Sequence, residues 1–163
     1  MSTGTMDRVD HRDAQQVAAV AAEIAALAAE INEEHGRKMG GVGTALPPNW
    51  SAADVAALIE RIGERGAVFY CRMDGRLVAF AIVQPDPVEP GTATMGVWVH
   101  EAYRRRGIGT QLAELGLAFA RDAGYTKLRG TIPASNEPAL SFFSSIGPIV
   151  QVAGGGMLYE LPV

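Results

Sequence analysis

The segment Val97–Leu112 constrains the fold most, because an apolar strand pattern runs into three arginines and two glycines and then into an amphipathic helix. Gly107 and Gly109 let the backbone turn its N–H groups toward a ligand, and the helix that opens there adds the positive end of its dipole. The guanidinium groups of Arg104–Arg106 provide further donors that suit phosphate. The segment therefore predicts a strand–loop–helix unit that binds an anion such as pyrophosphate. The alternative is a basic turn whose arginines are only solvated.

Two common phosphate-binding loops are excluded by spacing. A dinucleotide-binding fingerprint requires a third glycine where this chain has Leu112, and the pattern GxxxxGK[ST] occurs nowhere in the sequence. The pattern that remains is Arg104-x-x-Gly107-x-Gly109, placed after a strand and before a helix.

Length and composition indicate one globular domain. The 163 residues are enough to bury a sizeable core, and 48% hydrophobic with 20% charged residues is typical of folded proteins. We expect residues 1–6 to be disordered and residues 7–163 to form a single domain. A net charge of -4, with the arginine triplet as the one basic run, argues against a nucleic-acid partner.

The sequence also favours a cytoplasmic protein with no membrane partner. We find no apolar run long enough to span a bilayer, and the N-terminus has neither the charge nor the apolar core of a secretion signal. Cys71 is the single cysteine and cannot form an internal disulfide. Its strand-like neighbours predict a buried or half-buried thiol, which fits a reducing compartment.

The N-terminal part of the chain is predicted to be helical. Apolar residues three and four apart predict a helix from Arg12 to about Glu34, and packing on a sheet is favoured over a short coiled-coil seam. Four glycines and two prolines in His35–Trp50 predict a long loop, either a lid over an acceptor site or a simple connector. Ser51 is a suitable N-cap for a second helix of about four turns.

A hairpin is predicted next. The β-rich runs Ala67–Met73 and Leu77–Gln84 flank Asp74-Gly75, a turn that requires positive φ, so the two strands should be antiparallel neighbours.

The arginine loop lies inside a predicted parallel unit. The strand Thr92–Val99 precedes it, a helix from Gly107 to a cap at Gly124 follows, and Lys127–Ile132 returns as a strand. Because a whole helix separates the two strands, they should be parallel.

A second motif lies downstream, Asn136-x-x-Ala139-x-x-Phe142-Phe143-x-x-x-Gly147, with Asn136 as N-cap of a last helix before the strands Ile149–Val152 and Met157–Leu161. The two motifs resemble the two CoA-contacting motifs of the GNAT acyltransferase superfamily, and the order of elements is similar to that fold. The resemblance implies an α/β (α+β) fold with a mixed central sheet of about six to seven strands. Its central pair is parallel and splayed, and about four helices flank it.

The resemblance also implies acetyl-CoA as the acyl donor, with the pantetheine arm in the opening between the two parallel strands. An N–H of Trp98 or Val99 would then stabilise the oxyanion. For Asn136, helix capping alone is the alternative to cofactor contact. The residues implied to bind the cofactor are Val97, Trp98, Val99, Arg104, Arg105, Arg106, Gly107, Ile108, Gly109, Thr110, Asn136, Phe142 and Phe143.

The implied reaction is acetyl transfer to the primary amine of a small molecule by direct attack on the thioester, with no metal. Many relatives have a tyrosine acid where this chain has Phe143 and a strand carboxylate where it has Thr94, so neither role carries over. The substitutes, each of which could instead be structural or solvated, are Ser144 and Tyr159 as acids and Glu33, Glu34 and His35 as bases. Tyr103 and Tyr125 rank lower.

Two other functions remain open from the sequence. The missing tyrosine and carboxylate would fit a catalytically degenerate CoA-binding sensor, and a wide groove would fit an acetyltransferase for protein lysines or N-termini. Dimers are common in families of this kind, so a homodimer is also left open.

Overall fold

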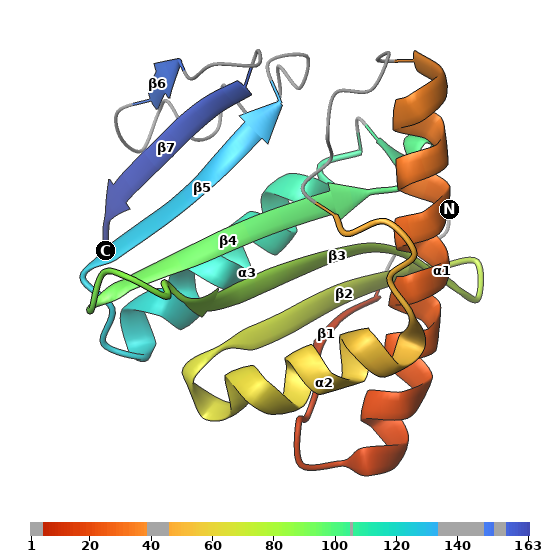
Figure 1. The fold of residues 1–163 in the computed structure, drawn as a ribbon, viewed down its shortest axis with the longest axis horizontal. Coiled ribbons are helices and arrows are strands. Elements are labelled where there is room, and N and C mark those ends of the chain that lie inside the picture. Colours follow the sequence, from red (N-terminus) through yellow and green to blue (C-terminus); the bar gives the residue numbers. More distant parts are fainter. Residues whose placement is uncertain (1–4, 39–45, 105, 134–148, 152–155) are drawn as a thin grey trace.

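The fold is a seven-stranded mixed sheet covered by helices on both faces, shown in Figure 1. The computed structural model describes residues 5–38, 46–104, 106–133, 149–151 and 156–163. The sheet order is β1-β2-β3-β4-β5-β7-β6, and the β4–β5 pair is parallel while its neighbours are antiparallel. The strands are β1 (Thr5–Arg8), β2 (Ala67–Met73), β3 (Arg76–Pro85), β4 (Thr92–Val99), β5 (Lys127–Pro133), β6 (Ile149–Gln151) and β7 (Gly156–Pro162).

The described helices are α1 (Ala14–Lys38), α2 (Ala52–Ile62) and α3 (Ile108–Asp122), with short 3₁₀ turns at Gly63–Arg65 and Glu101–Tyr103. The predicted mixed sheet with a central parallel pair is confirmed. The predicted last helix after Asn136 lies outside the described residues.

The core has a layer on each face of the sheet because side chains alternate along each strand. Val68 and Tyr70 of β2 pack in the cluster that contains α1 and α2, whereas Phe69 and Cys71 pack in a cluster with the start of α3. Cys71 is fully buried, as predicted, and burial raises the pKa of its thiol.

Local signals in the sequence explain the hairpin and the second helix. Asp74 and Gly75 both have positive φ, 53° and 78°, so the two-residue turn joins β2 to β3 as predicted. At the start of α2, the Asp54 N–H donates to Ser51 Oγ and the Ser51 N–H donates to Asp54 Oδ2, both at 3.1 Å. This capping box confirms Ser51 as the N-cap.

Strand β1 was not predicted. Thr5–Arg8 pairs antiparallel with β2, so Thr5 and Met6 belong to the sheet, and the expectation of disorder through residue 6 is wrong for these two. The strand is short, mostly exposed and at the edge of the sheet, which removes the apolar alternation that signals a strand.

Helix α1 extends past the predicted end at Glu34 to Lys38, so the first four residues of the predicted loop His35–Trp50 are helical. Adding turns to an existing helix needs no new nucleation, so one glycine does not stop it. The end of the predicted loop packs near α1. Leu46 is buried, and Asn32 Nδ2 of α1 donates to the carbonyl of Pro47 at 3.3 Å. Residues 39–45 of the predicted loop lie outside the described residues.

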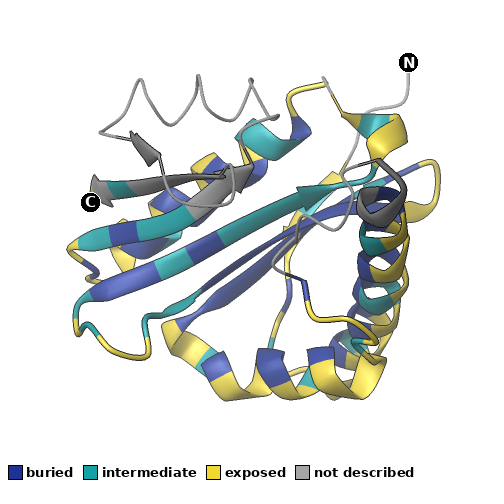
Figure 2. Cartoon of the chain, turned by 45° about the horizontal axis from the view of Figure 1, so that its top comes forward, coloured by how far each residue is buried: buried dark blue, intermediate teal, exposed yellow. Residues whose placement is uncertain are grey.

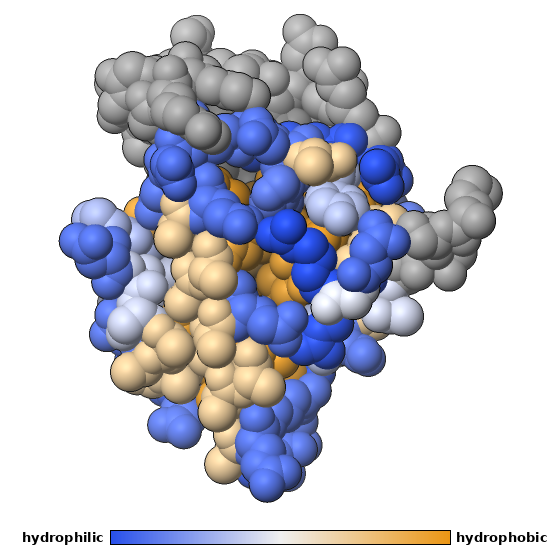
Figure 3. Space-filling model, turned by 90° about the vertical axis from the view of Figure 1, so that its right-hand side faces the viewer, coloured by the Kyte–Doolittle hydropathy of each residue, from blue (hydrophilic) through white to orange (hydrophobic). Residues whose placement is uncertain are grey.

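By length and composition alone, the 21 residues Ala14–Glu34 would suffice to cross a membrane, which corrects the expectation that no run is long enough. Alanines make the helix apolar on its solvent side also, and Figure 3 shows a pale orange band on this side of the molecule. The inner stripe packs in the core, and Glu23 and Glu30 pair with Arg72 and Arg76 of the sheet. In this structure α1 is a core helix.

Candidate active site

The central parallel pair of strands opens into a V. Pairing between β4 and β5 is confined to Thr92–Thr94 and Lys127–Arg129. Beyond Thr94, β4 continues beside β3 to Val99 while β5 continues beside β7 to Pro133, as Figure 1 shows. Burial falls along β4 as β5 departs, from dark blue to teal in Figure 2. We call the paired part the closed end and the part from Val97 to Val99 the open end.

The backbone of β4 presents alternate residues to the opening. The His100 N–H donates to Val78 O at 2.8 Å and the Asp86 N–H donates to Thr92 O at 2.9 Å, and the register between them is uninterrupted. In an antiparallel ladder hydrogen-bonded pairs alternate, so Trp98 bonds to β3, whereas Val97 and Val99 direct their N–H and C=O groups toward the opening. The Trp98 N–H is therefore directed to β3, whereas the Val99 N–H is directed to the opening.

The arginine and glycine loop forms the predicted turn into α3. Gly107 caps the helix with φ of 80°, and the first helical hydrogen bond runs from the Gln111 N–H to Gly107 O at 3.0 Å. The N–H groups of Ile108, Gly109 and Thr110 lie in the first turn, where a helix has no acceptors of its own. A Cβ on Gly109 would lie 3.5 Å from Val99 Cγ2, so this turn lies against the open end of β4.

The three arginines of the loop differ in their surroundings. Arg104 Nη1 and Nη2 donate to the two carboxylate oxygens of Glu34 at 2.7 and 3.0 Å, and Arg104 Nε donates to Val99 O at 3.0 Å. Arg106 is exposed and its guanidinium lies 5.2 Å from the ring centre of Tyr103. Arg105 lies outside the described residues. The geometry thus directs Arg104 to α1, in contrast to its predicted role toward phosphate.

A polar hollow of about 170 Å³ lies beside the open end. Its lining consists of Glu30, Ile31, Glu33, Glu34, His100 and Glu101. His100 Nδ1 accepts the Ala102 N–H at 3.1 Å, which leaves the hydrogen on Nε2, 3.5 Å from Glu30 Oε2. The described residues include no cluster of His, Cys, Asp and Glu arranged for a metal ion. Of the four carboxylates on the wall of the hollow, Glu30 pairs with Arg76 and Glu34 with Arg104.

His100 was missed by the sequence analysis. Its position could have indicated it, because His100 directly follows the strand that leads into the arginine loop and so lies at the end of the sheet.

The predicted acids and bases fall in different places. Glu33 is exposed on the wall of the hollow, whereas Glu34 is buried and committed to Arg104. His35 is in α1 and Tyr159 is in β7, opposite Gly130, but the side chains of both lie outside the described part. Four further predicted residues lie wholly outside it: Asn136, Phe142, Phe143 and Ser144.

The two lower-ranked tyrosines both have a partner for the hydroxyl, and the ring of Tyr103 lies 5.9 Å from that of His100 beside the open end. The Tyr125 hydroxyl donates to Arg65 O at 2.6 Å, a structural contact, and the Tyr103 hydroxyl donates to Asp74 at 3.4 Å.

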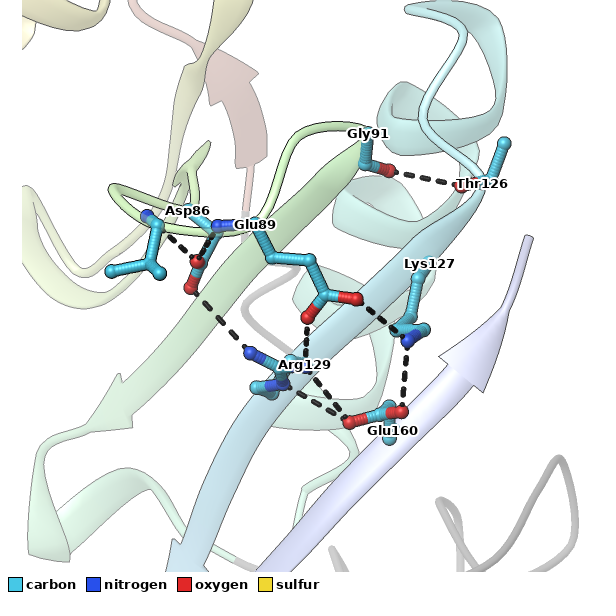
Figure 4. Close-up of polar contacts among 8 residues, drawn as sticks. Asp86, Glu89, Gly91, Thr126, Lys127, Arg129 and Glu160 are labelled. Carbon is cyan, nitrogen blue, oxygen red and sulfur yellow. Dashed lines mark hydrogen bonds and ion pairs between the residues drawn. The ribbon is translucent and has the colours of Figure 1, made fainter.

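A network of charged side chains lies at the closed end, as Figure 4 shows. Lys127 Nζ lies 3.0 Å from Glu89 and 3.1 Å from Glu160, and Arg129 pairs with the same two glutamates and with Asp86. Lys127, and then Arg129, hold the pKa of Glu89 and of Glu160 below its usual value. The network joins the β3–β4 connection to β5 and β7 at the vertex of the V.

Comparison with known proteins agrees with this geometry. The family model for the acetyltransferase (GNAT) family matches residues 27–147, so the chain belongs to the GNAT acetyltransferases. Enzymes of this family use acetyl-CoA. No curated protein sequence gives a significant match.

Solved structures show the same fold at low identity. A GNAT family acetyltransferase from Streptococcus pneumoniae has a TM-score of 0.73 at 13% identity, covering 99% of this chain and 100% of its own. The YncA structure from Salmonella typhimurium with its cofactor acetyl-CoA has a TM-score of 0.71 at 17% sequence identity. The match covers 98% of this chain and 93% of that one. The PaiA N-acetyltransferase from Thermoplasma acidophilum in complex with coenzyme A has 0.69 at 12%, covering 99% of each chain.

Proposed function

We propose that this acetyltransferase moves an acetyl group from acetyl-CoA to the primary amine of a small molecule by direct attack on the thioester. The observation that carries the proposal is the divergence of β4 from β5 after Thr94, with Val97 and Val99 directed into the opening and the first turn of α3 beside them. Bound acetyl-CoA would supply the activated acyl group.

The residues present fit this donor. The N–H and C=O groups of Val97 and the N–H of Val99 can bond the amides of the pantetheine arm as an added strand would, while the Val99 carbonyl accepts from Arg104. The N–H groups of Ile108, Gly109 and Thr110, together with Arg106, can hold the pyrophosphate. An ideal Cβ at Gly109 would meet Val99 and Val97 at 3.5 and 3.8 Å, so this turn is packed directly on the open end of β4.

The acidic hollow supports an amine as the acceptor. Glu30 and Glu34 on its wall are paired with Arg76 and Arg104, but Glu33 is exposed and Glu101 also lines the hollow, and exposed carboxylates attract a protonated amine. His100, the first residue after β4, places this hollow next to the open end. Its small volume favours a small molecule over an extended peptide.

The amine must lose a proton before it attacks. Glu33 lines the hollow and is exposed to solvent, so it can accept that proton and pass it to water. Glu34 is unsuitable, because its two oxygens already accept from Arg104. Thr94 lies at the vertex of the V and cannot act as a base at neutral pH. Proper placement of the amine against the thioester can supply much of the remaining rate.

Calorimetry with acetyl-CoA and CoA, followed by a thiol-release assay over a panel of small primary amines, tests the proposal. We expect saturable binding of both nucleotides and turnover with at least one amine class. Absence of binding at millimolar acetyl-CoA would contradict it. Tight binding with no turnover over a broad amine panel would instead favour the sensor, and turnover of peptides alone would favour a protein acetyltransferase.

A further inference from the structure

We infer that Arg104 is a positioning residue and not a ligand of the cofactor phosphates. Through Glu34 it holds the open end of β4 against helix α1, and we call this contact the bracket. The inference rests on the proposed function, since it concerns how the CoA site is held in shape. It assigns a role to the first residue of the arginine motif and to Glu34, which the sequence had offered as a base.

The contacts of Arg104 connect three parts of the molecule. Its Nη1 and Nη2 lie 2.7 and 3.0 Å from the two oxygens of Glu34 near the end of α1. Its Nε donates to Val99 O at the end of β4. Three residues later Gly107 caps α3. The one guanidinium therefore holds α1, the end of β4 and the loop before α3 in a fixed relation.

The burial of Glu34 explains why this arrangement persists. The residue is 5% exposed, so its carboxylate depends on Arg104 for the hydrogen bonds that water would otherwise give. If Arg104 turned to a phosphate, a buried carboxylate would lose its partner, which is strongly unfavourable. Arg106 is the contrasting case, because it is exposed and its guanidinium lies over the ring of Tyr103.

The two roles for Arg104 predict opposite effects of removing the charge of Glu34. If Arg104 were a phosphate ligand restrained by Glu34, the variant Glu34→Gln would release it, remove a negative charge near the site and tighten CoA binding. If Arg104 is a bracket, Glu34→Gln loosens the loop and weakens CoA binding, as Arg104→Gln does. Because both variants then break the same contact, the double variant should be no weaker than either single variant.

The experiment is calorimetric titration of CoA into wild type, Glu34→Gln, Arg104→Gln and the double variant, each at several salt concentrations. We expect each variant to raise the Kd for CoA by about 5- to 10-fold, a typical cost of lost preorganisation. The salt dependence of the Kd should stay as in wild type, since no phosphate contact is lost. Arg104→Lys keeps the charge and can reach Glu34, but it lacks the donor for Val99 O, so it should restore only part of the affinity.

Two matched controls separate the bracket from general effects. Arg106→Gln removes the same charge from the same loop, and we expect it to weaken CoA binding with a shallower salt dependence. Glu23→Gln breaks another ion pair between α1 and the sheet, with Arg72, away from the opening. It should lower the unfolding temperature without changing the Kd for CoA, because a merely structural pair affects the folded fraction and not the site.

The outcomes are distinguishable. If wild type does not bind CoA, the proposed function fails. If wild type binds CoA and Glu34→Gln binds it more tightly, or if Glu34→Gln changes only the unfolding temperature, the bracket is wrong while the proposed function stands. Weaker binding by Glu34→Gln and Arg104→Gln alike, with no additivity, supports the bracket.

Discussion

The two ends of the β4–β5 pair are built in different ways. At the closed end, three residue pairs and a network of five charged side chains hold the strands together. At the open end, the cross-strand ladder is absent among the described residues, and Arg104 on the buried Glu34, with His100 near Glu30, ties the end of β4 to α1 instead. The difference shows how a sheet can carry a ligand site in its middle: side chains fix the vertex, and backbone groups beyond it are left for a ligand.

The largest expected effect comes from closing the open end. Gly109→Glu should raise the Kd for CoA by about 100-fold or more, because a carboxylate at the first turn of α3 repels the pyrophosphate and takes its space. Calorimetry measures the change, and circular dichroism checks that α3 remains helical. Gln111→Glu is the matched control, since it adds the same charge at an exposed position of the same helix. Unchanged affinity in Gly109→Glu would show that the loop does not bind CoA.

A smaller effect is expected on the acceptor side of the open end. Glu33→Gln should raise the KM for the amine by about 3- to 10-fold, the range for a charge at a solvent-exposed rim, and leave the Kd for CoA unchanged. If Glu33 is the base, kcat should fall as well near neutral pH, and the loss should shrink at high pH, where the amine is already unprotonated. Glu60→Gln, on the exposed face of α2, is the control for a simple loss of charge. Equal values of KM and kcat in the two variants would show that the hollow does not bind the acceptor amine.

The smallest effect on binding is expected at the closed end. Glu160→Gln should lower the unfolding temperature at pH 7 and leave the Kd for CoA unchanged, because Glu160 acts on the vertex alone. Lys127 lowers the pKa of Glu160, so its stabilisation is present above the ordinary carboxyl pKa of 4.5 and is lost as the pH falls through the lowered value.

Thermal unfolding of wild type and Glu160→Gln between pH 7 and pH 3 measures this. The difference in unfolding temperature should shrink below about pH 4.5, the ordinary carboxyl pKa. A difference that persists unchanged at pH 3 would mean that the network does not stabilise the closed end through charge.

Much of the framework follows from local patterns. The Asp74-Gly75 turn, the Ser51 cap and the Gly107 turn each need particular residues, and the structure has them where the sequence indicates. Strand β1 escaped prediction because Thr5–Arg8 is an exposed edge strand whose partner is more than sixty positions away. Pairing at such a distance leaves no local periodicity.

The site was only partly predictable for the same reason. The sequence indicated the anion-binding turn, but it could not indicate that Arg104 faces Glu34, a contact across 70 positions. It also could not say which N–H groups of β4 face the opening, since that depends on the register with β3, seen at His100 and Val78. The hollow is likewise a product of packing between α1 and the end of β4.

The most direct test of the account is amide hydrogen exchange of β4, resolved residue by residue by NMR, with and without CoA. The N–H of Trp98 is already bonded to β3, so its exchange should not change. The N–H groups of Val97 and Val99 face the opening, and saturating CoA should slow the exchange of at least one of them. Slowing at Val97 or Val99 with Trp98 unchanged is the predicted result. Bound CoA that leaves both Val97 and Val99 unprotected would contradict the claim that the open end of the β4–β5 pair holds the cofactor.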